Sequence, residues 1–152
     1  MRATRIQTLA VVVLTLGLTG AASAAEVKQE ITVPQGSWTL WRKIGPFCAI
    51  KAWHPAIANC ERSREKLTFF RTLTLKDGGK IKEKLTGAGK GSYSYSIEES
   101  ALPVKNYTAT IAVAPAAADK KQSTITWTAK FDPKDKTEAE AKAVIDGIFK
   151  AG

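Results

Sequence analysis

Six stretches of the chain alternate apolar or aromatic side chains with threonine, serine, lysine or glutamate. A period of two places every second side chain on the same face of a β-strand, so each stretch is expected to be half-buried. Strands of this kind form antiparallel sheets that have one face against the core and one face in water. The stretches cover residues 26–33, 66–75, 80–85, 92–99, 106–113 and 123–131.

The last element is predicted to be a helix. Thr137, followed three residues later by Glu140, forms a capping box that begins it. Its apolar residues recur with helical spacing and form one stripe, which must be buried against the concave face of a curved sheet. Two short helices are expected after the first strand, in residues 36–45 and 46–53. The fold class is therefore α+β, in one domain over residues 26–152. The stripe consists of Ala141, Val144, Ile145, Ile148 and Phe149.

The N-terminal residues have the three-part layout of a secretory signal peptide. Two arginines, Arg2 and Arg5, precede an apolar run over residues 9–18, and small residues follow as far as Ala24. The run is shorter than the roughly 20 residues of a membrane-spanning helix. We expect residues 1–25 to be cleaved near Ala24 or Ala25, with export to a bacterial periplasm and no stable membrane anchor afterwards.

The exported protein would remain basic. Loss of two arginines lowers the formal charge from +9 to +7. An acidic ligand, an acidic partner protein or an anionic membrane surface would suit this charge, and so would a lysine-rich surface without a specific role. No arginine-rich run or nucleic-acid-binding motif occurs, and nucleic acid is not an expected partner outside the cytoplasm.

Both cysteines and the single histidine lie within residues 48–60. Two cysteines in an exported domain predict a disulfide between Cys48 and Cys60. A reactive thiol is the alternative. One histidine with two separated cysteines is a poor zinc set, so no metal or other cofactor is expected. His54, between Trp53 and Pro55, is either a packing residue or a ligand contact.

Arg71 and Glu83 interrupt the apolar faces of two neighbouring strands. A hairpin centred on Gly78 would pair Leu73 with Glu83 and make Arg71 a diagonal neighbour on the same face. The two charges could form an ion pair inside the sheet, since an unpaired charge there would cost several kcal/mol. Alternatively, they could join Tyr95 and Tyr107 as the few polar contacts of a mostly apolar pocket.

The order of elements and several motifs resemble the START-like (SRPBCC) superfamily, in particular its bacterial polyketide cyclase/dehydrase branch. This resemblance implies a helix-grip fold, with about seven strands wrapped on the C-terminal helix, similar to plant abscisic-acid receptors and pollen-allergen-type proteins. In those receptors a carboxylate at the place of Glu83 and a tyrosine at the place of Tyr107 line the hormone cavity. The motifs are "WHPAI" (53–57), "RTLTLKDGGKIKEKL" (71–85), "SYSYSIEESALPVKNYTATIAV" (92–113) and "ITWTAKFDP" (125–133).

The resemblance implies a periplasmic binding protein for a small hydrophobic or amphipathic molecule, held between sheet and helix. It also places Cys48 on the second short helix and Cys60 on the next strand, so that their disulfide fixes the turn at Trp53 near the cavity mouth. One alternative is an accessory protein that contacts an acidic redox partner, as in methanol oxidation. Another is a cyclase- or dehydratase-type enzyme with Glu83 as acid or base. The expected ligand contacts are Arg71, Glu83, Tyr95, Tyr107, Trp127, Trp53, His54, Ile145 and Phe149.

Overall fold

The computed structural model describes residues 24–152, so the predicted signal peptide lies outside the described residues except for its last two positions. Seven strands and three helices follow one another along the chain. Among the described helices, none has the length and apolar character needed to cross a membrane. The elements are β1 (Ala25–Val33), α1 (Ser37–Ile44), α2 (Ile50–Trp53), β2 (Ile57–Glu65), β3 (Thr68–Leu75), β4 (Lys80–Gly89), β5 (Ser92–Glu99), β6 (Val104–Pro115), β7 (Ser123–Pro133) and α3 (Glu138–Ala151).

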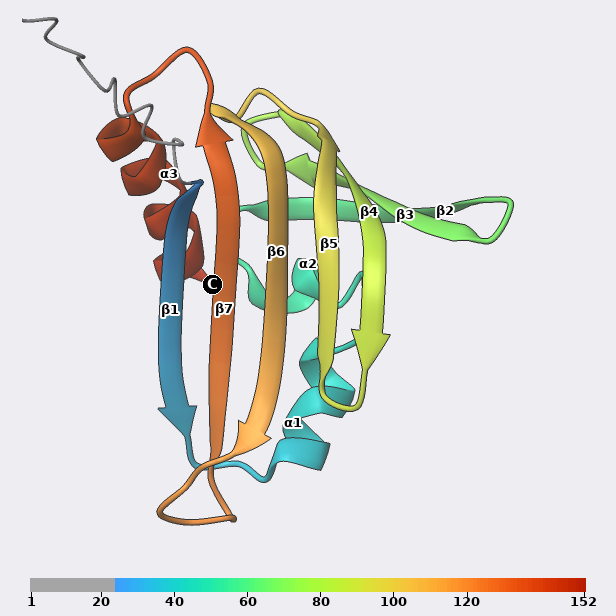
Figure 1. Cartoon of the computed structure of the whole chain (residues 1–152). Coiled ribbons are helices and arrows are strands. Elements are labelled where there is room, and N and C mark those ends of the chain that lie inside the picture. The colour runs from blue at the N-terminus through green and yellow to red at the C-terminus, as the bar shows by residue number, and fades with distance from the viewer. Residues whose placement is uncertain (1–23) are drawn as a thin grey trace, which may run out of the picture.

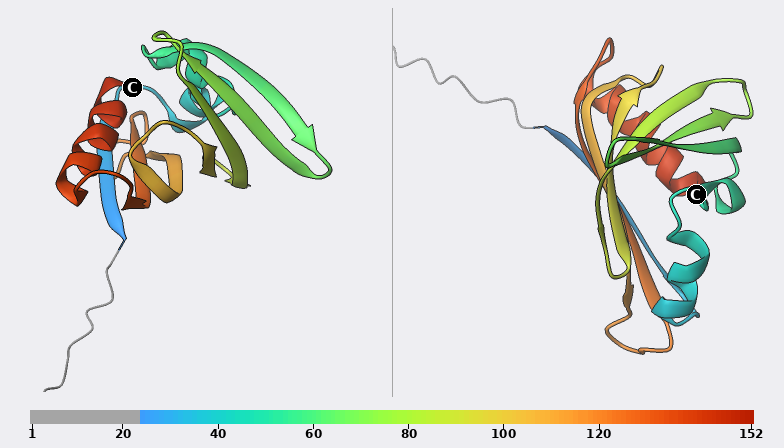
Figure 2. Two further views of the ribbon diagram at one scale, coloured as in Figure 1. Left: turned by 90° about the horizontal axis from the view of Figure 1, so that it is seen from above. Right: turned by 90° about the vertical axis from the view of Figure 1, so that its right-hand side faces the viewer.

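The strands form one antiparallel sheet in the order β1-β7-β6-β5-β4-β3-β2. Strands β2 to β7 are a meander of consecutive neighbours, and β1 closes the sheet by pairing with β7. The sheet is curved, and the three helices lie on its concave side (Figures 1 and 2). The predicted α+β architecture, with a C-terminal helix across a curved sheet, is confirmed.

The core fills the space between the concave face and α3. The alternating aromatic residues of β5 and β7 point into it, as the period of two predicts. Thr137 caps α3 through the predicted capping box, and Ala141, Ile145 and Phe149 carry the buried side of the helix. The sheet side of the core consists mainly of Tyr93, Tyr95, Tyr107, Ala109, Ile111, Trp127, Ala129 and Phe131.

The register of β3 and β4 differs from the prediction. Leu73 lies opposite Ile81, and Arg71 lies directly opposite Glu83 rather than on a diagonal. The hairpin centre is one position earlier, because Leu75 and Gly79 close a three-residue loop. Gly78 has a φ of +90° and completes this turn, as the last residue of such loops commonly does. The shift moves each pairing by two residues, so the apolar faces still coincide.

Four residues predicted to lie on apolar faces are exposed: three on strands and Val144 on α3, which is 39% exposed. Ile31 of β1 is 60% exposed, because it lies at the sheet edge where α3 does not cover it. Leu67 and Phe69 are 85% and 47% exposed, because the end of the β2–β3 hairpin extends away from the rest of the sheet (Figure 1). Phe70, the neighbour of Phe69, is the buried aromatic residue at this end of β3.

Candidate functional site

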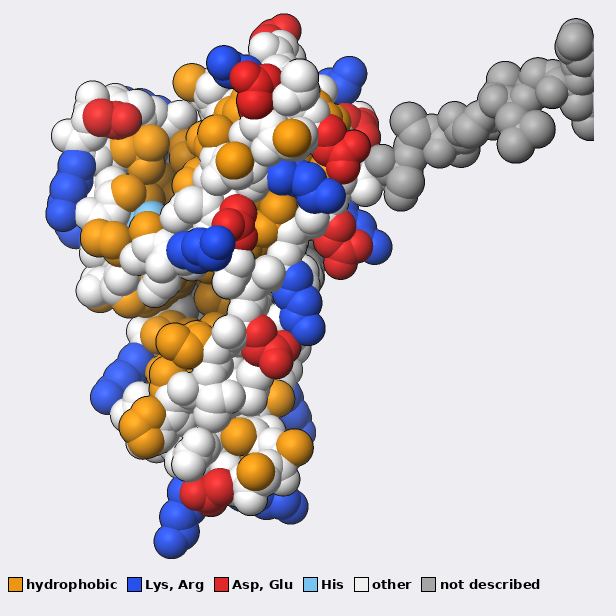
Figure 3. All heavy atoms as spheres, turned by 90° about the vertical axis from the view of Figure 1, so that its left-hand side faces the viewer, with side chains coloured by type: hydrophobic (Ala, Val, Ile, Leu, Met, Phe, Trp, Pro, Cys, Tyr) orange, Lys and Arg blue, Asp and Glu red, His pale blue; other side chains and the backbone are white. Residues whose placement is uncertain are grey.

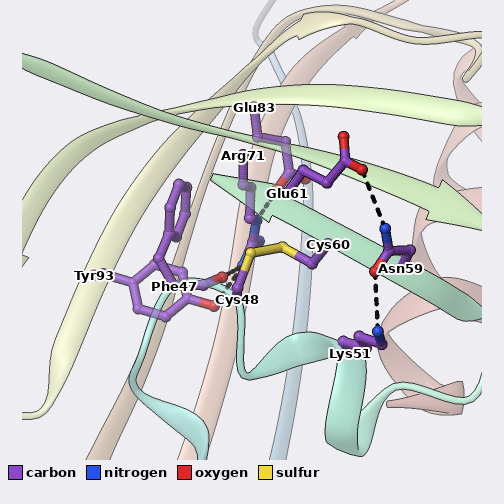
Figure 4. The surroundings of a disulfide bond; sticks show 9 residues. All are labelled: Phe47, Cys48, Lys51, Asn59, Cys60, Glu61, Arg71, Glu83 and Tyr93. Atoms are coloured by element: carbon purple, nitrogen blue, oxygen red, sulfur yellow. Dashed lines mark hydrogen bonds and ion pairs between the residues drawn. A yellow bond between two sulfur atoms is a disulfide. The ribbon is translucent and has the colours of Figure 1, made fainter. Parts of the chain in front are cut away.

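Arg71 and Glu83 form an ion pair in the interior. Arg71 Nε donates a hydrogen bond to Glu83 Oε2 at 2.5 Å, and Nη1 donates to the Phe47 carbonyl oxygen (Figure 4). The guanidinium lies 4.2 Å from the Phe47 ring centroid and 5.1 Å from that of Tyr95. Arg71 is completely buried and Glu83 is 5% exposed. This arrangement supports the ion-pair interpretation of the two charges.

Burial and mutual attraction act in opposite directions on the two groups. Burial raises the pKa of the Glu83 carboxyl group, while the adjacent guanidinium opposes this rise. Burial is the largest single influence on the pKa of Arg71 and lowers it, but the Glu83 carboxylate together with Tyr93 and Tyr95 outweighs burial and raises that pKa. Each ionised side chain is therefore stabilised in the interior by the opposite charge of the other.

An inner hollow lies between the sheet and α3. Its volume is about 90 Å³, whereas ligand pockets usually reach several hundred Å³. Seven of the nine predicted ligand contacts line it, and the remaining walls are aliphatic. Arg71 does not line it, since the guanidinium lies among Phe47, Tyr93 and Tyr95. The seven are His54, Glu83, Tyr95, Tyr107, Trp127, Ile145 and Phe149.

A larger outer groove opens at the β1 edge, with a volume of about 330 Å³. Figure 3 views the molecule from this side and shows hydrophobic side chains gathered around a recess. Strands β1, β6 and β7 supply its floor, and the ends of α1 and α3 supply its sides. The lining residues are Gln29, Glu30, Ile31, Ile44, Trp53, Ile111, Ile125, Trp127, Phe149, Lys150 and Gly152.

An aromatic wall of Trp53, Trp127 and Phe149 separates the two hollows. The rings of Trp127 and Phe149 are stacked with centroids 4.1 Å apart, and Trp53 meets Trp127 edge-on at 5.6 Å. Trp127 and Phe149 line both hollows. Trp127 Nε1 donates to the Tyr95 hydroxyl at 3.0 Å, which fixes the indole in this position. The wall is therefore the boundary between the outer groove and the inner hollow.

His54 joins the turn after α2 to the last turn of α3. In the neutral ring, Nε2 donates to the Ile148 carbonyl oxygen at 3.0 Å, and Nδ1 accepts from the Ala56 amide at 3.2 Å. A single tautomer satisfies both contacts, whereas protonation of Nδ1 would remove the acceptor. Burial lowers the pKa of His54, partly opposed by the bond to Ile148. His54 therefore has a packing role, and its ring also borders the inner hollow.

This geometry predicts a pH-dependent loss of stability. The folded-state pKa of His54 lies below the ordinary value of about 6.5, so the unfolded chain takes up the proton more readily as the pH falls. The contribution of the neutral His54 ring to the free energy of unfolding is complete above about pH 6.5 and is lost progressively below it. Urea unfolding of the wild type should therefore lose more stability between about pH 7.5 and about pH 5.5 than His54→Gln does. Equal losses in the two proteins would contradict this role.

The predicted disulfide between Cys48 and Cys60 is present, with Cα atoms 5.6 Å apart. Cys60 lies on β2 as expected, but Cys48 lies in the turn before α2 rather than on that helix. The helix begins only at Ile50, because the chain first turns sharply after Pro46. The bond also fixes the position of Phe47, the residue whose carbonyl oxygen accepts from Arg71 (Figure 4).

The predicted site residues therefore fall into three groups. Trp53 lines the outer groove, seven others line the inner hollow, and Arg71 is buried in its ion pair with Glu83. The prediction missed most of the groove, including Ile31, Ile111 and Ile125. Their alternation marked them as core residues, and nothing local distinguishes a core position from a groove position. No sequence pattern predicts that the Phe47 carbonyl oxygen accepts a hydrogen bond from Arg71.

Comparison with solved structures identifies several relatives. The protein XoxI from Bacillus cereus is 27% identical, with a TM-score of 0.79 over 84% of this chain and 89% of that chain. A START superfamily protein from Mycobacterium smegmatis is 11% identical, with a TM-score of 0.66 over 83% of this chain and 90% of that chain. The Zhui aromatase/cyclase from Streptomyces is 13% identical, with a TM-score of 0.66 over 84% and 85%. At 11% and 13% identity, the similarity to the START superfamily protein and to the aromatase/cyclase shows the fold alone.

None of the curated proteins compared with this chain matches it. The sequence model of one family, described as polyketide cyclase / dehydrase and lipid transport, matches residues 24–152. That match covers every strand and helix described above. The START superfamily protein and the aromatase/cyclase share the fold of this chain, each with a TM-score of 0.66. The chain therefore belongs to the polyketide cyclase / dehydrase and lipid transport family.

Proposed function

We propose that this protein binds a small hydrophobic or amphipathic molecule in the outer groove, with the inner hollow as an extension behind the aromatic wall. The observation that carries the proposal is the groove itself, which is about 330 Å³ in volume and lined mainly by isoleucine and aromatic side chains. This volume lies at the lower end of the usual range for ligand pockets. The family description, which includes lipid transport, supports the same class of ligand.

Polar groups at the groove indicate where a ligand would be oriented. Trp53 lines the groove, and its Nε1–H is buried without a hydrogen-bond partner among the described residues, so the indole would have to turn for a ligand to reach this donor. Gln29 and Lys150 border the opening. An apolar body with one acceptor group, such as a carbonyl or carboxylate oxygen, fits this combination. Glu83 is held by Arg71 beside a hollow of about 90 Å³, so no reaction at this carboxylate is proposed.

Binding would take place in the periplasm. The N-terminal pattern of charged, apolar and small residues supports export, and a disulfide is typical of oxidising compartments. Mass measurement of the protein isolated from a periplasmic extract tests this, with the mature chain expected to begin at Ala25 or Glu26. Retention of residues 1–23 in that protein would contradict cleavage.

Ile31→Glu provides a direct test of the groove. The probe is 1-anilinonaphthalene-8-sulfonate, an aromatic anion whose fluorescence rises in apolar surroundings. Burying an isoleucine against a guest is worth about 1.5–3 kcal/mol, so the variant should bind the probe at least about tenfold more weakly. Ile31 is 60% exposed, and the fold should therefore tolerate the change.

Val144→Glu is the matched control. Val144 is an exposed aliphatic residue of α3 that does not line the groove, so this variant should bind the probe like the wild type. Equal binding by Ile31→Glu and the wild type would contradict the proposed site. Native mass spectrometry of protein purified from its own host should also show a bound apolar molecule, and empty protein there would argue against a carrier.

A second candidate function is contact with an acidic protein in the same compartment, and a redox protein is one such partner. The observation that favours it is the projecting β2–β3 hairpin, whose exposed residues include Arg62, Arg64, Lys66 and the apolar Leu67. Complementary charge would steer such a partner to this end of the sheet and make its binding sensitive to salt.

A further inference from the structure

Strands β3 and β4 separate before either of them ends. Their pairing runs from Thr74 opposite Lys80 to Phe70 opposite Lys84 and stops there. Strand β4 continues to Gly89 while paired with β5, and β3 continues to Thr68 while paired with β2. Figures 1 and 2 show the β2–β3 hairpin diverging from β4 at this point. Within residues 24–152, residues 85–89 of β4 therefore have a strand partner on one side alone.

This free edge of β4 has small side chains. From Thr86 to Gly89 the residues are exposed, and the sequence of the edge is Leu-Thr-Gly-Ala-Gly. Glycine within a strand often marks a place where another backbone approaches closely. The outer edge of β2 is different, because Glu61, Arg62, Arg64 and Glu65 crowd it with charges, which is how natural sheets protect an edge. The edge of β4 lacks this crowding.

A groove occupies the space between the free edge and the hairpin. Residues 67–69 form one side and residues 84–88 form the other, with a volume of about 510 Å³. Leu67 and Phe69 present apolar surface to it although they are largely exposed to water. Five residues of extended chain span about 17 Å, which matches the length of the unpaired edge.

The charges of the residues around the groove indicate which kind of partner segment it would bind. Arg64 lies over the Phe69 ring at 5.2 Å, and Glu65 is paired with Lys82 at 3.4 Å. A second copy of this chain would bring the same positive charge to the same place and be repelled, whereas an acidic strand would be attracted. Residues 61–69 and 84–90 carry the basic side chains Arg62, Arg64, Lys66, Lys84 and Lys90, against the acidic side chains Glu61 and Glu65.

We propose that the free edge of β4 accepts an extended acidic segment of a partner protein as an additional strand, seated in the groove against Leu67 and Phe69. Backbone hydrogen bonds to residues 85–89 supply affinity, and the alternating side chains of the segment meet the apolar groove and the basic rim. The inference rests on the second candidate function above and specifies the surface and the conformation of the partner. It is independent of the ligand groove at the β1 edge.

A short capped peptide of alternating glutamate and valine is the probe. Added to the isotope-labelled protein at low salt, it should shift the amide resonances of residues 67–69 and 85–89 and slow hydrogen exchange at the edge. A lysine–valine peptide of the same length should not bind. Shifts confined to other residues, equal binding of the lysine–valine peptide, or equal binding of a helical acidic peptide would each overturn the proposal.

Ala88→Glu tests the edge from the side of the protein. A like charge opposite the acidic peptide should weaken its binding by about tenfold or more. Ala114→Glu, at an exposed alanine of β6 that does not line the groove, carries the same charge change and should bind as the wild type does. Self-association of the wild type through residues 85–89 would overturn the choice of partner.

The partner function and the β4 edge as its site can fail separately. An acidic host protein that co-purifies at low salt, is released by salt and is still retained by Ala88→Glu would support the partner function and overturn the edge as its site. Peptide binding at residues 85–89 without any such protein would support the edge and argue against the partner function.

Discussion

Replacing Arg71 by methionine is expected to lower the free energy of unfolding by about 3–5 kcal/mol. The guanidinium is completely buried and is bonded to Glu83 and to the Phe47 carbonyl oxygen. Arg71→Met leaves the Glu83 carboxylate without its partner in an apolar interior, and that desolvated charge accounts for most of the loss. Urea unfolding near pH 7 measures the effect.

The double variant Arg71→Met with Glu83→Leu is the control. Apolar residues of similar volume often replace a buried ion pair without loss, so most of the stability should return. In the single variant the pKa of Glu83 should rise further, because the favourable charge is gone. The folded state then binds the proton more strongly than the unfolded chain, and the deficit should shrink as the pH falls from about 7 toward about 5. A deficit independent of pH would show that packing, rather than charge, causes the loss.

Removing the disulfide with Cys48→Ala and Cys60→Ala is expected to cost about 3 kcal/mol of stability. The bond closes a loop with a sequence separation of 12, and its loss gives the unfolded chain more freedom. It also releases the segment of Phe47, whose carbonyl oxygen binds Arg71. Thermal and urea unfolding, with and without a reductant, measure the change.

Reduction of the wild type should reproduce the effect of the double alanine variant, and reductant should not alter that variant further. Alkylation before reduction should leave the wild type unlabelled if Cys48 and Cys60 are joined. Two labelled thiols, or a variant as stable as the wild type, would contradict the structural role of the bond.

The sequence predicts the strands and the helix well because both signals are local. The alternation around Tyr93 and Tyr95 and the stripe on α3 depend on periods that the backbone imposes. The capping box at Thr137 is equally local and is confirmed. The register of β3 and β4 was wrong because it depends on the loop type, and the pattern Asp-Gly-Gly allows a loop centred on Asp77 as well as on Gly78.

The site was less predictable, because the size of a cavity depends on how completely the surrounding side chains fill the space between the sheet and the helix. Glu83 and Tyr107 do face an interior hollow, yet the size of that hollow depends on how Trp127, Phe149 and Ile145 pack together. The exposure of Leu67 and Phe69 arises from the divergence of two strands, which alternation cannot reveal. Whether the predicted residues contact a ligand stays a prediction.

The rings of Trp53, Trp127 and Phe149 stand packed between the outer groove and the inner hollow. Under the proposed function, a ligand in the outer groove could extend through this wall into the inner hollow only when the packed rings rotate together. Such rotations become frequent only when their neighbours loosen. The length of a ligand that spans both hollows would therefore depend on temperature, and a warm sample should admit a longer molecule than a cold one.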